Sequence, residues 1–267
     1  MPELPEVQTV LDGLWQVIQG RKIRSVECFY PGTLILDQSL ERDVFPAKVV
    51  QASRRGKYMI LELDSQAGMI IHLRMTGKLV FESHPGEPHK HERARINLEG
   101  GDAFRFIDPR TFGKISIFAL EDIASFLPKL GVEPLEPEYS AEYLQTAFAK
   151  RSAPVKNLLL DQSLVAGLGN IYVCELLFRA GIRPTREGNK LKKAELTRVV
   201  KHSKDVLTEA LAVGGTSISD YRRIDDKTGE FQNFLRVYQK CECPLGHPIA
   251  NVRLGGRSSF YCPVCQK

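Results

Sequence analysis

The pattern of hydrophobic residues changes near the middle of the chain, and this change constrains the fold more than any other feature. Between Ile23 and Phe118, short runs rich in β-branched and aromatic residues alternate with Gly, Pro, Asp and Ser, which is typical of an antiparallel sandwich or barrel. After the proline-bearing stretch 131–137, apolar residues recur at helical spacing instead. The sequence therefore predicts a β-rich domain, a linker and a helical domain.

Individual elements follow from the same patterns. Apolar residues at helical spacing predict a helix over residues 7–18, with Gly20 at its C-terminal cap. Ser140 begins a further helix, with Glu142 in the first turn. The predicted strands cover residues 23–29, 47–52, 58–63, 69–74, 95–98, 103–107 and 115–118, and the remaining helices cover 155–162, 170–180 and 193–213.

Composition limits the function classes. Of the 267 residues, 43% are hydrophobic and 26% are charged, as in an ordinary soluble globular protein. The net charge of +5 permits nucleic-acid binding without requiring it. No apolar run is long enough to cross a bilayer, and the N-terminus lacks the basic and apolar regions of a signal peptide. We therefore expect a cytoplasmic protein with no membrane partner.

The first six residues place a potential nucleophile beside two carboxylates at the start of a helix. Once the initiator methionine is removed, Pro2 exposes a secondary amine whose pKa, about 8, lies below the value of about 10.4 for lysine. The neutral amine can attack a sugar carbon to form a Schiff base, and a secondary amine gives a permanently charged iminium. Proline and glutamate are also favoured in the first turn of any helix, so this segment alone does not decide its role.

Three turns carry further candidate residues. The basic turn 54–58 contains Lys57, which could reach a phosphate or a sugar oxygen, although charge runs are often only solvated turns. The segments 72–77 and 108–113 each lie where a strand meets a turn. Exposed side chains there could enter a base stack, because extruding a nucleotide leaves a gap that must be filled. The candidates for this wedge are Met75, Arg110 and Phe112.

A glycine-punctuated turn at residues 161–172 runs into a predicted helix. Its backbone N–H groups, together with Asn170, could bind a phosphate. The alternative is a plain corner between two helices, with glycine where the backbone bends. The basic residues just upstream favour a phosphate backbone as the partner; they are Lys150, Arg151 and Lys156.

The C-terminal tail has the cysteine spacing of a metal site. The chain has six cysteines, which is sparse for a disulfide scaffold, and four of them lie within the last 27 residues. Cys262 and Cys265 have the C-x2-C spacing of a zinc ribbon. A structural zinc ion would stabilise a segment too small to have its own core. Arg257 falls near the tip of the predicted hairpin.

Together these segments resemble the bacterial formamidopyrimidine-DNA glycosylases, bifunctional repair enzymes that remove oxidised purines such as 8-oxoguanine. The resemblance rests on PELPEV, RRGKY, HLRMTG, DPRTFG, LVAGLGNIYVCE, GGTS and GRSSFYCPVCQK, which follow the family's order from end to end. It implies an α+β fold: an N-terminal helix on an antiparallel β-sandwich, a helical helix-two-turn-helix domain, and a C-terminal zinc-finger β-hairpin. The corresponding boundaries are 1–134, 135–228 and 229–267.

The resemblance also implies roles for individual residues. Pro2 would attack C1′ of the damaged nucleotide, and Glu3 would act as the acid/base carboxylate, with Glu6 supporting the same site. Lys57 would contact the phosphate and assist the lyase steps, and Arg257 would grip phosphates around the lesion. Met75, Arg110 and Phe112 would fill the gap left by the flipped base. The remaining DNA contacts implied are His91, Arg151, Lys156 and Asn170.

Two departures from the family pattern affect the metal site and the substrate. The family's first zinc pair is C-x2-C, whereas this chain has Cys241 and Cys243, two residues apart. Cys243, Cys262 and Cys265 are ligand candidates, and the fourth is either Cys241, which we favour, or His247. Ser219 stands where relatives often carry a lysine near the flipped base, which leaves the lesion preference open.

The expected activity is excision of oxidised purines from double-stranded DNA, followed by β,δ-elimination at the abasic site. We expect a monomer with one structural Zn2+. One alternative is the endonuclease VIII type, which uses the same proline chemistry on oxidised pyrimidines; Leu4 and the Arg110–Phe112 pair favour the purine enzyme. Another is a zinc-ribbon DNA-binding protein without catalysis, which would have no need of Pro2 followed by Glu3.

Overall fold

The structure is a computed structural model that describes residues 1–37, 40, 44–217 and 222–267. The chain forms two compact units. The first comprises Met1–Pro128 together with Val213–Glu230, and the second comprises Lys129–Ala212 together with Phe231–Lys267. The segment 213–230 therefore packs with the β-rich unit, although the sequence analysis assigned most of it to the helical domain.

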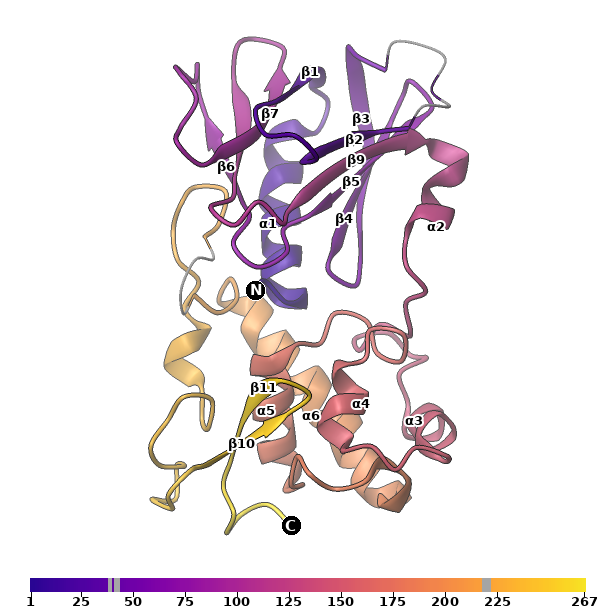
Figure 1. Cartoon of the computed structure of the whole chain (residues 1–267), viewed down its shortest axis with the longest axis vertical. Coiled ribbons are helices and arrows are strands. Elements are labelled where there is room, and N and C mark those ends of the chain that lie inside the picture. The colour runs from indigo at the N-terminus through magenta and orange to yellow at the C-terminus, as the bar shows by residue number, and fades with distance from the viewer. Residues whose placement is uncertain (38–39, 41–43, 218–221) are drawn as a thin grey trace. The chain divides into compact units, whose positions relative to one another are not determined.

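In the first unit, one helix packs on a nine-stranded sheet (Figure 1). The helix is α1 (Leu4–Ile18). The strands are β1 (Lys22–Cys28), β2 (Leu34–Leu36), β3 (Ala47–Arg55), β4 (Tyr58–Leu63), β5 (Ala67–His72), β6 (Lys78–Glu82), β7 (Glu92–Leu98), β8 (Ala103–Ile107) and β9 (Lys114–Ala119). They are followed by the short helices η1 (Leu120–Asp122) and α2 (Ile123–Phe126).

The sheet has two halves that share one core. Its strand order is β2-β9-β5-β4-β3-β1-β7-β8-β6, and the halves are joined where β1 pairs with β3 at Lys22↔Lys48 and Ile23↔Ala47. Among the described strands of this sheet, neighbouring pairs are antiparallel except β2 with β9. Side chains from both halves and from α1 form one buried cluster, so the predicted combination of a helix with a β-sandwich is confirmed.

Helix α1 is built as its sequence predicts. Its buried stripe consists of Leu4, Val7, Val10, Leu11, Leu14 and Ile18. Gly20 follows the helix with a φ of +79°, a conformation that glycine adopts without steric cost. Because this stripe faces the sheet, the helix start and the residues around it are held on a rigid element.

Two strands were not predicted, and both lie at the edges of the sheet. β2 and β6 occupy the two ends of the strand order. An edge strand pairs on one side only, so it needs less apolar sequence than a central strand. β2 is also only three residues long, and Ile35 and Leu36 in it are exposed.

The second unit is helical with a terminal hairpin. It contains α3 (Ala141–Phe148), α4 (Val155–Leu160), α5 (Asn170–Ala180), η2 (Gly188–Lys190), α6 (Lys193–Ala212), η3 (Phe231–Phe234), β10 (Ala250–Leu254) and β11 (Arg257–Tyr261). Ser140 caps α3 by accepting a hydrogen bond from the backbone N–H of Tyr143 at 3.1 Å, as predicted. Helix α5 contacts α4, α6 and β11, and is therefore central to this unit. Among the described residues no helix is both long and apolar enough to span a bilayer.

Candidate functional site

The chain start forms a buried group of carboxylates. Pro2 is buried, and Glu3 and Glu6 expose 3% and 2% of their surface. The backbone N–H of Glu3 donates to the Glu6 carboxylate at 2.8 Å, and the two residues form a capping box at the start of α1. The positive end of the helix dipole stabilises both carboxylates. The structure thus places the predicted acid/base residue Glu3 directly beside Pro2, on a fixed helix end.

Glu6 also connects the helix to a distant segment. Its Oε1 accepts a hydrogen bond from the backbone N–H of Thr216 at 2.7 Å. Gly215 lies against the same carboxylate with a φ of +81°, and a Cβ at this position would come within 2.8 Å of Glu6 Oε1. Glu6 therefore does more than support the site, because it fixes the position of residues 215 and 216.

Lys57 lies in the turn between β3 and β4. Only 6% of the surface of Lys57 is exposed to solvent. The preceding residue of the turn, Gly56, has a positive φ. The turn is held against α1 because Arg54 Nε donates to Gln8 Oε1 at 2.9 Å. Lys57 thus lies in a turn between two strands that both pack against the helix preceded by Glu3.

His72, for which the sequence suggested no role, is a neutral neighbour of Lys57. Burial, followed by the positive charges of Arg74 and Lys57, lowers the pKa of His72 to about 3. Its Nδ1 accepts the backbone N–H of Arg74 at 2.9 Å, and its ring contacts the edge of Tyr58 at 4.4 Å between centroids. The uncharged imidazole therefore fills the space below the basic turn without adding positive charge.

Asp108 organises the two turns that were predicted to carry wedge residues. It is fully buried and accepts hydrogen bonds from the hydroxyl of Thr76, from the backbone N–H of Arg110 at 3.1 Å and from that of Gly113 at 2.7 Å. Its own N–H donates to the carbonyl of His91 at 2.9 Å. The Asp108 carboxylate therefore joins the 72–77 turn to the 108–113 turn, and the Asp108 backbone joins both to the residue before β7.

The predicted wedge side chains lie on the exposed side of these turns. Met75 and Phe112 are 41% and 48% exposed, which is unusual for large apolar residues. The guanidinium carbon of Arg110 lies 5.0 Å from the centre of the Phe112 ring, within cation–π distance. His91 is partly buried, with Nδ1 3.3 Å from a guanidinium nitrogen of Arg93. The first unit thus presents Met75, Arg110, Phe112 and His91 from turns fixed by Asp108.

In the second unit, Asn170 joins helix α5 to the terminal hairpin. Lys156 is fully buried, and its ammonium group donates to Asn170 Oδ1 at 2.6 Å. The amide nitrogen of Asn170 donates to the carbonyl of Ser258 at 3.0 Å. Arg257, next to Ser258, is exposed at the hairpin tip. The structure therefore brings together Lys156, Asn170 and Arg257, with Lys156 lying beneath Asn170 instead of on the surface.

The turn before α5 is fixed by Gln162, a residue that sequence reasoning did not single out. Its amide nitrogen donates to the carbonyls of Leu160 and Leu168 at 3.0 and 2.9 Å, and its carbonyl accepts the N–H of Gly167 at 2.9 Å. A glutamine that satisfies three backbone groups holds the turn in one shape, which a backbone anion site requires.

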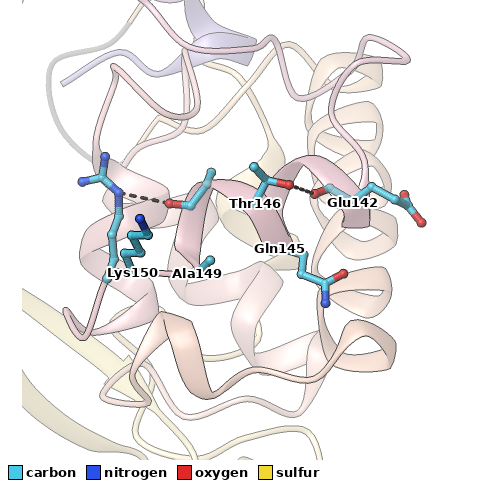
Figure 2. Close-up of a pocket in the computed structure, with 7 residues that line it drawn as sticks. Glu142, Gln145, Thr146, Ala149 and Lys150 are labelled. Carbon is cyan, nitrogen blue, oxygen red and sulfur yellow. Dashed lines mark hydrogen bonds between the residues drawn. The ribbon is translucent and has the colours of Figure 1, made fainter.

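Arg151 lies along a hollow beside helix α3. The hollow is lined by Glu142, Gln145, Thr146, Ala147, Ala149, Lys150 and Arg151 (Figure 2). Arg151 Nε donates to the carbonyl of Ala147 at 3.0 Å, and Thr146 donates to that of Glu142 at 3.1 Å. Lys150 and Arg151 are exposed, so this end of α3 presents two positive charges.

Four side chains in the tail could hold a metal ion. The ligand atoms of Cys243, His247, Cys262 and Cys265 all lie within 4.8 Å of one another. Interaction with the Cys262 thiol, together with burial, raises the pKa of Cys265 to about 12. A coordinated cation would lower the pKa of this thiol instead, because a thiol bound to a metal is deprotonated. The cluster therefore has the composition and spacing of a Cys3His metal site.

The fourth member of the cluster is His247, and our preference for Cys241 needs correction. Cys241 is exposed and lies outside the cluster. The N–H of Cys243 donates to the carbonyl of His247 at 2.9 Å, which folds residues 243–247 into a tight turn. His247 Nδ1 thereby lies 3.6 Å from the Cys243 sulfur and 3.3 Å from the Cys265 sulfur.

Glu175 ties the tail to helix α5, a role with no local sequence signal. Its carboxylate is fully buried and accepts the backbone N–H groups of Arg236, Val237 and Tyr238 at 2.9, 3.0 and 2.9 Å. The chain leading into the cysteine cluster is thus fixed to the same helix that begins at Asn170. Ser219, where the chain departs from the expected family pattern, lies outside the described residues.

Comparison with known proteins agrees with this arrangement. Residues 1–115 match the family model for the formamidopyrimidine-DNA glycosylase N-terminal domain, and residues 130–222 match the model for the H2TH domain of the same glycosylases. Among curated proteins, formamidopyrimidine-DNA glycosylases from Pelotomaculum thermopropionicum and Desulfitobacterium hafniense are 38% and 40% identical. The matches cover all of this chain and 99% and 100% of those proteins.

Solved structures show the same relationship. A mutant FPG of Lactococcus lactis in complex with a Fapy-dG-containing DNA superimposes with a TM-score of 0.92 at 33% identity, covering 100% of both chains. The MutM (FPG) protein of Thermus thermophilus gives a TM-score of 0.89 at 34% identity, covering 99% of this chain and 98% of that chain. The chain belongs to the formamidopyrimidine-DNA glycosylase family.

Proposed function

We propose that this chain is a bifunctional DNA glycosylase of base-excision repair, which excises oxidised purines and then cleaves the strand at the abasic site. The observation that carries the proposal is the helix start, where Pro2 is buried beside the carboxylates of Glu3 and Glu6. A protein that only binds DNA gains nothing from a nucleophile placed there. Relatives solved with Fapy-dG-containing and abasic DNA support the same substrate class.

In the proposed reaction the Pro2 amine, freed by removal of Met1, attacks C1′ of the damaged nucleotide. The bond from nitrogen to C1′ forms as the glycosidic bond breaks, and its electron pair leaves with the base. Glu3 transfers protons as the sugar ring opens, leaving an iminium between Pro2 and C1′. The Glu6 carboxylate holds the N–H of Glu3 and so keeps Glu3 in position.

The iminium prepares the strand for cleavage. Its positive charge acidifies the proton on C2′, so loss of that proton expels the 3′ phosphate by β-elimination, and δ-elimination then releases the 5′ phosphate. Lys57 contacts a phosphate and assists these proton transfers. The low pKa of His72 keeps the adjacent imidazole neutral, so it does not compete with Lys57 for the anion.

The remaining residues bind the DNA. Met75, Arg110 and Phe112 enter the gap left by the extruded nucleotide, which their exposure and their fixed turns support. Asn170 and Arg257 contact phosphates around the lesion, and Lys156 orients Asn170 from below. His91 and Arg151 extend these contacts along the backbone.

The tail holds one structural Zn2+ in this proposal. Three thiolates and one imidazole are a common donor set for a structural zinc ion, and they match the cluster Cys243, His247, Cys262 and Cys265. The ion stabilises residues 229–267 as a zinc-finger hairpin that presents Arg257, following a catalytic domain (1–134) and a helix-two-turn-helix domain (135–228). We further propose that the protein acts as a cytoplasmic monomer.

A paired-lesion assay tests the proposal. Equal amounts of duplex carrying 8-oxoguanine opposite cytosine and duplex carrying an oxidised pyrimidine are incubated with the protein, and base release and strand cleavage are measured. We expect release of 8-oxoguanine with cleavage on both sides of the site. Cleavage of the oxidised pyrimidine alone would assign the chain to the endonuclease VIII type of activity. Binding of both duplexes without cleavage of either one would indicate a DNA-binding protein without catalytic activity.

A further inference from the structure

Two exposed aromatic side chains at the end of β1 each lie against an arginine of the neighbouring strand β7. Phe29 and Tyr30 are 37% and 40% exposed. The guanidinium carbon of Arg95 lies 5.4 Å from the centre of the Phe29 ring, and that of Arg93 lies 5.1 Å from the centre of the Tyr30 ring. Both distances are within cation–π range. None of these four residues has a role in the function proposed above.

The charges of the two arginines are compensated differently. Arg95 is buried, and its Nε donates to the buried carboxylate of Glu92 at 2.7 Å. Arg93 is only partly buried, and no carboxylate of a described residue forms an ion pair with it. A planar guanidinium stacked on an aromatic ring keeps its edge available for hydrogen bonds. Arg93 therefore presents a positive charge that no described carboxylate neutralises.

Two hydrogen bonds orient the guanidinium of Arg93. Its Nε donates to the carbonyl of Asp108 at 2.8 Å, and its Nη2 lies 3.3 Å from Nδ1 of His91. Because a guanidinium has no acceptor, His91 Nδ1 accepts this bond, and the ring keeps a proton on Nε2 that it can donate elsewhere. The other terminal nitrogen of Arg93, Nη1, has no hydrogen-bond partner among the described residues. One NH2 group of a fixed guanidinium is thus left for a ligand.

The turn that carries Tyr30 is fixed as well. The carbonyl of Gly32 accepts a hydrogen bond from the Lys114 ammonium, and that of Thr33 accepts the N–H of Ile115 at 2.9 Å. Both donors belong to the start of β9, which directly follows the turn that carries Arg110 and Phe112. The ring that supports Arg93 is therefore held to the same part of the sheet as these wedge residues.

We propose that Arg93, supported by Tyr30, binds a phosphate of the DNA backbone beside the 108–113 turn. This inference rests on the proposed function, in which side chains of that turn enter the base stack. A side chain that enters a base stack has the DNA backbone on its flank, and Arg93 is bonded to the turn at the carbonyl of Asp108. Phosphate oxygens accept hydrogen bonds from a guanidinium and neutralise its charge. Arg93 and His91 thus bind the backbone from adjacent positions.

The salt dependence of DNA affinity tests the charge of Arg93. Dissociation constants are measured at several salt concentrations with duplex DNA carrying a tetrahydrofuran analogue of an abasic site, which has no leaving group at C1′. Arg93→Gln removes the charge and keeps an amide donor for the carbonyl of Asp108. We expect the slope of log K against log salt concentration to fall by about 1, and the affinity to fall at least about fivefold.

Three further variants separate charge, stacking and position. Arg93→Lys keeps the charge and should keep the wild-type slope. Tyr30→Ala removes the stacked ring and should weaken binding about two- to fivefold, whereas Tyr30→Phe keeps the ring and should bind as wild type does. Arg24→Gln is the matched control and should leave the slope unchanged, because it removes the same charge from an exposed position at the opposite end of β1 from Tyr30.

A double variant distinguishes direct binding from an effect through His91. If Arg93 binds a phosphate itself, Arg93→Gln lowers the slope by about the same amount in the wild-type protein and in His91→Ala. An unchanged slope in Arg93→Gln, no further change in the His91→Ala background, or an equal loss of slope in Arg93→Lys would each overturn the inference. A wild-type protein without salt-dependent affinity for duplex DNA contradicts the proposed function instead.

Discussion

The hydroxyl of Thr76 donates a hydrogen bond to the buried carboxylate of Asp108, and this bond joins the two turns that carry Met75, Arg110 and Phe112. The turns are more than 30 positions apart in sequence, so the side chains that we propose to enter the base stack can act together only if a contact joins the two turns. Asp108 also accepts the N–H groups of Arg110 and Gly113, and thereby fixes the shape of its own turn.

We predict that Asp108→Ala separates the wedge residues and destabilises the fold. Three donors lose their acceptor, and buried unsatisfied groups cost about 1–3 kcal/mol each, so a loss of roughly 3 kcal/mol in the free energy of unfolding is expected. Thr76→Val is the matched control, because it removes one of these bonds and should cost about 1 kcal/mol. Denaturant unfolding measures both values.

A comparison of two DNA substrates separates the proposed role of Asp108 in positioning the wedge residues from its role in stability. In Asp108→Ala, excision from duplex DNA should fall by at least about tenfold, while cleavage of single-stranded abasic DNA, which has no stack to fill, should fall much less. Equal losses on the two substrates, measured at a temperature where the variant is folded, would contradict a role for Asp108 in positioning the wedge.

His72 should make the stability of the protein depend on pH in a defined window. Its folded pKa of about 3 lies below the ordinary value of 6.5. Above pH 6.5 the imidazole is neutral in both states, whereas below it the unfolded chain binds a proton that the folded chain does not. Stability is therefore lost as the pH falls from 6.5 towards 3, by at most about 1.4 kcal/mol per pH unit.

His72→Asn tests this effect, because the asparagine oxygen can still accept the N–H of Arg74. The difference in unfolding free energy between wild type and the variant should be constant above pH 7 and should shift in favour of the variant as the pH falls to 4.5. A difference that stays flat across this range would show that His72 is protonated in the folded protein.

The metal site gives a prediction with an internal control. His247→Ala should lower the zinc content of the purified protein, measured by inductively coupled plasma mass spectrometry, because a ligand is lost from a four-ligand cluster. Cys241→Ser should retain one zinc per chain, because Cys241 is exposed and outside the cluster. The reverse result, zinc lost in the serine variant and kept in the alanine variant, would contradict the geometry.

Phosphate binding by Arg257 should appear in the salt dependence of DNA affinity. Arg257→Ala should reduce the slope of log K against log salt concentration by about 1, since each phosphate contact contributes about 0.9. Lys193→Ala removes the same charge where the lysine pairs with Glu142 at 2.8 Å, and should leave the slope unchanged. Equal slopes for wild type and Arg257→Ala would exclude this arginine as a phosphate contact.

Local signals made much of the fold predictable. The range 170–180 was predicted as a helix and is α5, because glycines precede it and Gly181 ends it with a φ of +71°. The buried stripe of α1 and the Ser140 cap also follow from spacing and residue type alone. The edge strands β2 and β6 were missed, since one-sided pairing leaves a weak apolar pattern.

The missed parts of the site depend on contacts between distant residues. Glu175 accepts hydrogen bonds from backbone groups some 60 positions later in the sequence. Ile224 packs against Gly13, although the two residues lie near opposite ends of the chain. The choice between Cys241 and His247 depended on how residues 243–247 fold, which cysteine spacing alone does not determine. The roles of Pro2, Glu3, Lys57 and Arg257 remain predictions that only chemistry on DNA can test.

The most direct test of the central claim is borohydride trapping. The protein, its Pro2→Gly variant and its Glu3→Gln variant are each mixed with duplex DNA carrying one 8-oxoguanine opposite cytosine and reduced, and the crosslinked peptide is identified by mass spectrometry. We predict a covalent adduct on Pro2 in the wild-type protein and none at residue 2 in Glu3→Gln, with DNA affinity retained in both variants. An adduct on a lysine, or full strand cleavage by Pro2→Gly, would contradict the assigned nucleophile.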